Sequence, residues 1–148
     1  MKIKLIFIMS LLVASIMFLG CTPEGNQGEW LDIKHDHDQQ YQVRAIGSFY
    51  WISPEEKYLV VVYQVTNTGK APLDFDWTNK LVIDQEGRKF TPINGERSGN
   101  VQPLEKSEPL RVEYSLPPAV NLNTLWWGLA HEGKFRYKIK LNPMRGVE

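Results

Sequence analysis

Hydrophobic and polar residues alternate along most of the chain after residue 30, and this two-residue period restricts the fold more than any other feature. The segment 110–116 reads Leu-Arg-Val-Glu-Tyr-Ser-Leu, and the segment 135–141 reads Phe-Arg-Tyr-Lys-Ile-Lys-Leu. Successive side chains of a β-strand point to opposite faces of its sheet, so each segment presents one apolar face and one polar face. The pattern therefore predicts strands that are buried on one side.

Turn-forming residues divide the apolar segments into about seven short strands. The strongest segment, 58–65, is apolar on both faces, which is typical of a strand buried on two sides. The segment 84–87, Asp-Gln-Glu-Gly, separates two further strands and places a glycine where a hairpin turn needs positive φ. The chain after residue 21 shows no amphipathic helix of useful length. These patterns predict an all-β, antiparallel β-sandwich that follows an N-terminal signal helix.

The first 21 residues differ from the rest of the chain. Lys2 and Lys4 precede an apolar run at 5–19, and Gly20 and Cys21 close it. This pattern resembles the signal peptide and lipobox of a bacterial lipoprotein. A basic start, an apolar centre and a small residue at the cleavage site are the features of a secretory signal. Residues 1–20 are therefore predicted to be a signal peptide that is removed before Cys21.

The resemblance implies that Cys21 carries the lipid that attaches the protein to a membrane. A membrane-spanning helix is one alternative, but residues 5–20 give about 24 Å of helix against a hydrocarbon core of ~30 Å. Phe18 and Leu19 depart from the usual lipobox, and an unpaired exported thiol is the other alternative. In a Gram-negative host, Thr22 after the cysteine favours the outer membrane, on its periplasmic side.

The composition of the chain after residue 20 limits the partners and the means of stabilisation. These 128 residues hold 15 basic and 17 acidic residues without a basic stripe, so nucleic acid is not an expected partner. The sequence also shows no polybasic patch that would strengthen attachment to anionic lipid. Because Cys21 is the only cysteine, the domain has no intramolecular disulfide and depends on the packing of its core.

A polar segment lies between Cys21 and the first predicted strand. It contains Pro23 and two glycines and reads as a flexible tether. The predicted organisation is therefore a signal peptide at 1–20, a tether at 21–29 and one β-sandwich domain at 30–148.

Three segments of the domain resemble one family. Residues 57–73 read Lys-Tyr-Leu-Val-Val-Val-Tyr-Gln-Val-Thr-Asn-Thr-Gly-Lys-Ala-Pro-Leu, and residues 81–92 contain Leu-Val-Ile-Asp-x-x-Gly-Arg-Lys-Phe-Thr-Pro. With residues 103–117, they resemble the telokin-like domain of unknown function, the DUF4352 type, of many bacterial lipoproteins. The resemblance covers about residues 40–142. It implies an extracytoplasmic, immunoglobulin-like β-sandwich with no generally assigned activity.

Two histidines near the start of the domain are candidate metal ligands. On a strand, His35 and His37 would share one face, and two imidazoles so placed are candidate ligands for Zn²⁺ or Cu²⁺. A solvated, polar strand start is the alternative, because closed zinc sites use four ligands. The segment His131-Glu132 begins like a zinc-protease motif, but Phe135 stands where the second histidine is required.

Trp126 and Trp127 are the candidate binding residues. As neighbours on a predicted strand they face opposite sides, so one is expected to fill the core and the other to be exposed or covered by a loop. An exposed tryptophan beside Trp51 or Trp77 would stack on a sugar ring or anchor a protein partner. Burial of both indoles is the alternative interpretation.

The sequence shows no recognisable catalytic motif and no cofactor motif, so it predicts a protein that acts by binding and is not an enzyme. The expected function is that of a membrane-anchored, extracytoplasmic lipoprotein, an interaction or accessory module of the cell envelope with a protein partner. The alternative is a ligand-binding module for glycan or a divalent metal.

Overall fold

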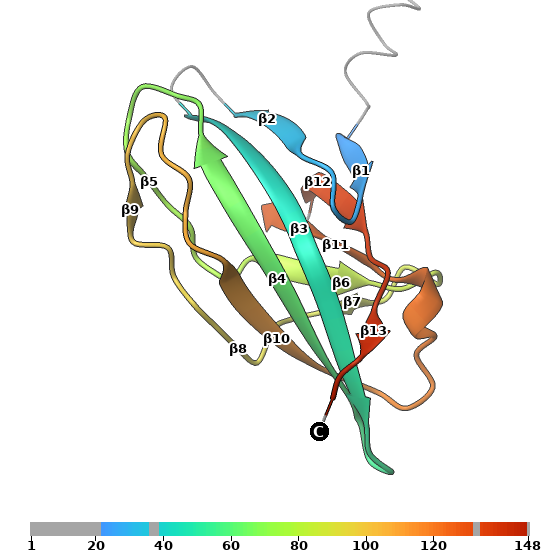
Figure 1. Ribbon diagram of the computed structural model, residues 1–148. Coiled ribbons are helices and arrows are strands. Elements are labelled where there is room, and N and C mark those ends of the chain that lie inside the picture. The colour runs from blue at the N-terminus through green and yellow to red at the C-terminus, as the bar shows by residue number, and fades with distance from the viewer. Residues whose placement is uncertain (1–21, 36–38, 132–133, 148) are drawn as a thin grey trace, which may run out of the picture.

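The computed structural model describes residues 22–35, 39–131 and 134–147, which form β-strands joined by turns and loops (Figure 1). Seven described strands have four residues or more: β2 (Leu31–His35), β3 (Gln39–Ile52), β4 (Lys57–Asn67), β6 (Lys80–Ile83), β10 (Leu110–Leu116), β11 (Trp126–His131) and β12 (Lys134–Lys140). Six are shorter: β1 (Glu24–Asn26), β5 (Leu73–Asp74), β7 (Lys89–Phe90), β8 (Asn94–Gly95), β9 (Asn100–Val101) and β13 (Met144–Arg145). The predicted signal helix lies outside the described residues.

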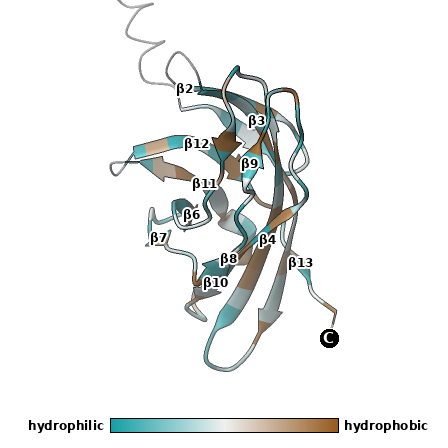
Figure 2. Ribbon diagram, turned by 90° about the vertical axis from the view of Figure 1, so that its left-hand side faces the viewer, coloured by the Kyte–Doolittle hydropathy of each residue, from teal (hydrophilic) through white to brown (hydrophobic). Residues whose placement is uncertain are grey.

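The strands form two main sheets that pack face to face (Figures 1 and 2). The β11 sheet has the order β1-β12-β11-β6-β7, in which β1 runs parallel to β12. The β4 sheet has the order β13-β3-β4-β10-β8, and β2 also pairs with β3. Strands β5 and β9 form a separate small pair. The prediction of an all-β, antiparallel β-sandwich is confirmed.

The core lies between the two sheets and follows the predicted two-residue period. The alternate residues of β10 are buried, namely Leu110, Val112, Tyr114 and Leu116. On β12, Tyr137 and Ile139 are fully buried, whereas Phe135 is partly exposed. Figure 2 shows hydrophobic segments in brown on β4 and on the layer of β11 and β12.

The hairpin between β6 and β7 forms where the sequence predicts it. Gly87 has a φ of 78°, which glycine adopts without steric cost. Asp84 closes the turn, because its Oδ1 accepts hydrogen bonds from the backbone amides of Glu86 and Arg88. Its Oδ2 accepts a 2.6 Å bond from the Arg88 guanidinium, and these bonds favour the charged form of Asp84.

The segment predicted to be a flexible tether is in part a strand of the sandwich, which corrects the sequence analysis. Glu24–Asn26 forms β1 and pairs in parallel with residues 138–140 of β12. The Lys138 amide donates to the carbonyl oxygen of Pro23 at 3.0 Å. The composition of this segment is that of a coil, and long-range backbone pairing overrides it.

The helical structure of the described residues is a short 3₁₀ turn, η1 (Leu122–Thr124). Within those residues, no helix has the length and apolar character needed to cross a membrane.

Candidate functional site

Trp127 belongs to the core. Its side chain is fully buried, and its Nε1 donates to the Tyr114 hydroxyl at 2.8 Å. That hydroxyl donates in turn to the carbonyl oxygen of Lys80 at 2.8 Å. The indole packs 5.0 Å from the Tyr63 ring and 6.1 Å from the Tyr137 ring, measured between centroids. Trp127 therefore presents no surface to a ligand, and it is no longer a candidate binding residue.

Trp126 lies on the opposite, outer face of the β11 sheet and is partly exposed. The Lys138 Nζ lies 4.9 Å from the centroid of the Trp126 ring, and the Lys140 Nζ lies 5.5 Å from it. Both lysines come from the neighbouring strand β12, where Lys140 is the direct partner of Trp126. Lys138 also forms a 3.1 Å ion pair with Glu24 of β1. We call these four residues the Trp126 patch.

The other three tryptophans are distributed over the molecule and do not extend this patch. Trp51 packs 5.9 Å from Tyr58, and Trp77 packs directly against the backbone of Gly95. The binding surface that the sequence analysis considered, an exposed tryptophan beside Trp51 or Trp77, is therefore not formed. Trp126 instead has the lysines of β12 on one side and Ile83 of β6, its partner across the other strand pair, on the other side.

Trp30 is a surface aromatic that the sequence analysis did not single out. Its ring lies 4.6 Å from the Arg44 guanidinium and 5.5 Å from the Lys106 Nζ. Cation–π contacts of this kind bring together residues that are far apart in the chain. The sequence pattern around Trp30 could not have revealed this cluster, because folding brings Arg44 and Lys106 to the ring from distant parts of the chain.

A cavity of about 220 Å³ opens between the start of β3 and the segment 72–80. The Lys80 side chain at its base is buried, and its Nζ donates to the Asp76 carbonyl oxygen at 2.5 Å and to Asn79 Oδ1 at 2.7 Å. Burial lowers the pKa of the Lys80 ammonium group to about 8. Asp74 at the rim pairs with Arg97 at 3.0 Å.

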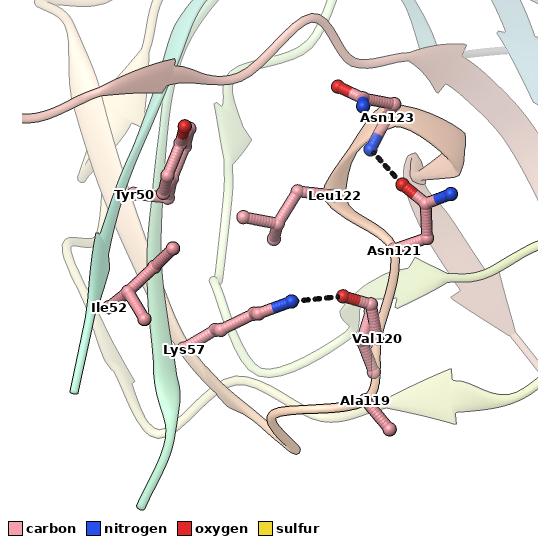
Figure 3. A pocket seen from close by; sticks show the side chains of 8 residues that line it. All are labelled: Tyr50, Ile52, Lys57, Ala119, Val120, Asn121, Leu122 and Asn123. Carbon is pink, nitrogen blue, oxygen red and sulfur yellow. Dashed lines mark hydrogen bonds between the residues drawn. The ribbon is translucent and has the colours of Figure 1, made fainter. Parts of the chain in front are cut away.

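A second cavity, of about 380 Å³, lies between the end of β3, the start of β4 and residues 119–123 (Figure 3). The Lys57 Nζ points across it and donates to the Val120 carbonyl oxygen at 2.8 Å. Asn121 and Asn123 form its rim, where the Asn123 amide donates to Asn121 Oδ1 at 3.0 Å. Its eight lining residues include no carboxylate that could act with Lys57 as an acid–base pair.

Of the two predicted metal ligands, the structure describes only His35. His35 ends β2, where its backbone pairs with Gln39, and His37 lies outside the described residues. In the part of the chain that is described, no group of three or more His, Cys, Asp or Glu side chains is placed to hold a metal ion. The site at His35 and His37 stays a prediction, and calorimetric titration with Zn²⁺ or Cu²⁺ tests it.

Cys21 also lies outside the described residues, but the residue after it is placed. Thr22 Oγ1 donates to the carbonyl oxygen of Phe135 at 3.5 Å, at the start of β12. The residue that follows the predicted lipid-bearing cysteine in the sequence therefore contacts the start of β12.

Comparisons with known proteins give two structures of similar shape. No model of a known family and no curated protein matches the chain. An uncharacterized β-sandwich protein from Clostridium difficile 630 has 14% identity and a TM-score of 0.49, over 82% of this chain and 95% of that chain. A putative lipoprotein from Bacillus subtilis subsp. subtilis str. 168 has 16% identity and a TM-score of 0.49, over 74% of this chain and 38% of that chain. Similarity at this level carries no conclusion about function, and membership of the DUF4352 type stays a prediction.

Proposed function

We propose that the protein is an exported lipoprotein, attached to a membrane by lipid on Cys21, whose β-sandwich acts as a non-catalytic interaction module of the cell envelope. The observation that carries this proposal is the position of β1. The strand that directly follows the lipobox-like segment is built into the same sheet as the Trp126 patch. A partner bound at this patch would be held close to the membrane. The family resemblance and, in a Gram-negative host, the outer membrane location belong to the same proposal.

The arrangement of the titratable groups supports a binding role over a catalytic one. In the cavity at Lys80, the ammonium group is bonded to two oxygens of its own turn, and Asp74 is paired with Arg97. In the cavity at Lys57, the ammonium group is bonded to a backbone carbonyl oxygen. A catalytic acid or base needs a proton position that faces the substrate. The ammonium groups of Lys80 and Lys57 and the Asp74 carboxylate instead form bonds that hold their neighbouring loops in place.

The chemistry of the Trp126 patch fits a protein partner. Tryptophan is enriched at the centres of protein interfaces, because it offers a large apolar area and one hydrogen-bond donor. Lys138 and Lys140 would meet acidic side chains of the partner at the rim, where charges steer association more than they add affinity. The patch therefore favours a partner that presents an apolar side chain within an acidic surface.

An acidic glycan is the second candidate ligand for the same patch. A partly exposed indole beside two lysines of β12, one of them paired with Glu24, offers a stacking face and cations, which suit a sugar ring that carries carboxylate or phosphate groups. A glycan and a protein are distinguished by their behaviour in the experiment below.

The first test is cross-linking of the full chain in its native membranes, followed by affinity purification and mass spectrometry. Wild type is compared with Cys21→Ala, Trp126→Ala and the matched surface variant Trp30→Ala. Incorporation of radiolabelled palmitate is measured in parallel. The proposal predicts label in all chains except Cys21→Ala, and one near-stoichiometric protein that is lost with Cys21→Ala and Trp126→Ala but kept with Trp30→Ala.

Other outcomes contradict separate parts of the proposal. Palmitate incorporation that persists in Cys21→Ala would overturn the lipid anchor. A partner that is kept in Trp126→Ala would move the interface elsewhere on the sandwich. No partner in any sample would favour the ligand module, and titration with an acidic polysaccharide would then show heat for wild type and little heat for Trp126→Ala.

A further inference from the structure

Leu104 is exposed on a strained backbone. Its side chain is 88% exposed, and its φ is 69°. Among the described residues, it is the one residue other than glycine with positive φ. This conformation is sterically unfavourable for a residue with a β-carbon. Leu104 adds nothing to the core. Its side chain is therefore available for contact with something outside the domain.

Asn67 holds the turn that presents Leu104, residues 101–105, in one position. The Leu104 amide donates to the Asn67 carbonyl oxygen at 2.8 Å, and the Asn67 amide donates to the Glu105 carbonyl oxygen at 2.9 Å. The buried Asn67 side chain donates from Nδ2 to the carbonyl oxygens of Val101 and Ala71, at 2.9 and 2.8 Å. The Leu104 side chain therefore projects from a braced turn.

The turn lies at the end of the sandwich where the chain enters. Thr22 contacts the carbonyl oxygen of Phe135, two residues before Tyr137. The Tyr137 ring lies 6.4 Å from the Tyr41 ring, and Tyr41 pairs across β3 and β4 with Asn67. Figure 1 shows β1 and the loop before β10 toward the upper end of the molecule.

The side chains beside the turn carry charges of both signs. Lys106 follows the turn and Lys70 lies in the neighbouring turn; both are exposed, as are Glu105 and Glu108. The Glu105 carboxylate accepts a 2.8 Å bond from the Gln102 amide. Because these four charges balance, the feature that suits a membrane interface is the exposed apolar tip, beside which long lysine side chains can extend to the headgroups.

We propose that the Leu104 turn is a membrane-docking element: Leu104 inserts among the headgroups of the bilayer that holds Cys21, and the long side chains of Lys70 and Lys106 extend to the lipid phosphates. This inference rests on the lipid anchor proposed above. Because the anchor keeps this end of the domain at the bilayer, even a weakly binding side chain is presented at high local concentration. Docking at this second point fixes the orientation of the sandwich and leaves the outer face of the β11 sheet turned to the side, accessible to a partner.

The test uses the absence of other cysteines. In the lipidated protein Cys21 is acylated, so Leu104→Cys introduces one reactive thiol. A polarity-sensitive fluorophore is attached there, and the protein is reconstituted into vesicles of phosphatidylethanolamine and phosphatidylglycerol. The proposal predicts a blue shift of the emission on reconstitution and strong quenching by lipids that carry a nitroxide in the headgroup region. The matched control is Glu55→Cys, in the exposed β3–β4 turn at the other end of the molecule, which is expected to show neither effect.

The outcomes separate this inference from the proposed function. A water-like emission at position 104, in protein whose Cys21 carries lipid, would overturn the docking element and leave the anchor intact. A chain that does not co-sediment with vesicles and whose Cys21 also takes the label would overturn the anchor and the docking element together. Equal quenching at positions 104 and 55 would also contradict a fixed orientation.

Discussion

The backbone amide of Leu104 donates a hydrogen bond to the carbonyl oxygen of Asn67 at 2.8 Å, so a fully buried residue holds an exposed one. Asn67 satisfies its own polar groups in the same arrangement, because its Oδ1 accepts from the Gly69 amide at 2.9 Å and its Nδ2 donates to two carbonyl oxygens. A buried amide with these partners is a stabilising feature. The two turns that it connects are therefore one structural unit.

Replacement of Asn67 by Ala is expected to lower the free energy of unfolding by about 3 kcal/mol, since it removes the side-chain partners of two carbonyl oxygens and one amide. Urea denaturation followed by tryptophan fluorescence measures the change. In hydrogen exchange, the amides of residues 101–105 are expected to lose protection more than those of β12. A loss below about 1 kcal/mol would show that Asn67 does not hold the two turns.

Leu104→Gly is expected to stabilise the protein by about 0.5–1 kcal/mol. Relief of the left-handed strain exceeds the extra backbone entropy that glycine gives to the unfolded chain. Leu104→Ala is the matched control, because it shortens the side chain and keeps the β-carbon, and it is expected to give no such gain. Thermal unfolding of both variants measures the effect, and a destabilised glycine variant would contradict the strain.

Tyr114→Phe is expected to cost about 2 kcal/mol of stability, because it leaves the buried Trp127 indole N–H and the Lys80 carbonyl oxygen without their partner. A double-mutant cycle with Trp127→Phe measures the coupling of the two residues. If the hydrogen bond contributes as proposed, the double variant is less destabilised than the sum of the two single variants. Strict additivity would contradict the coupling.

Stability is expected to rise with pH between about 8 and 9. The pKa of Lys80 is lowered by burial to about 8 in the folded protein, against 10.5 in the unfolded chain. In this range the unfolded chain binds more protons than the folded protein, so the free energy of unfolding increases, by about 1 kcal/mol at 1.4 kcal/mol per pKa unit. Urea denaturation across this range measures the rise, which Lys80→Met is expected to abolish.

Above about pH 9.5 the trend is expected to reverse, because burial raises the pKa of the core tyrosines, Tyr41, Tyr63, Tyr114 and Tyr137. The unfolded chain then loses tyrosine protons that the folded protein keeps, and stability falls as the pH increases. This fall should persist in Lys80→Met. Stability that stays constant from pH 8 to 9 in wild type would contradict the burial of the Lys80 charge.

Gly128→Ala is expected to prevent the normal pairing of β11 with β12. A β-carbon at this position would lie 2.0 Å from the Tyr137 carbonyl oxygen, and backbone cannot yield as a flexible side chain can. The expected loss is about 4 kcal/mol or more, enough to unfold a marginally stable domain. Gly25→Ala is the control, because its nearest atom would be at 3.5 Å. Circular dichroism and solubility measure both variants, and a normally folded Gly128→Ala protein would contradict the close approach.

The strands and the main turn could be predicted because their signals are local. The alternation in β10 and β12, the positive φ of Gly87 and the opposite orientation of Trp126 and Trp127 all follow from residues near one another in the chain. These signals fix which face of each strand enters the core. They are sufficient for the fold class.

The remaining features depend on contacts between distant segments, which local patterns do not encode. Strand β1 has the composition of a coil and becomes a strand because β12 offers it an edge. Lys80 reads as the polar start of a strand, yet the Asp76 carbonyl oxygen and Asn79 satisfy it in a buried position. The lysines beside Trp126 are separated from it by a hairpin. The candidate site was therefore only half predictable, with Trp126 identified and its charged surroundings missed.

The parallel pairing of β1 with β12 also determines how the protein would carry mechanical load. In the proposed lipoprotein, a partner that pulls on Trp126, Lys138 and Lys140 would pull on β11 and β12, while the bilayer resists through β1. The force would then pass through three neighbouring strands of one sheet and would bypass the opposite sheet. A pull along the strands would load the hydrogen bonds between β1 and β12 in shear, all at once, instead of opening them one at a time.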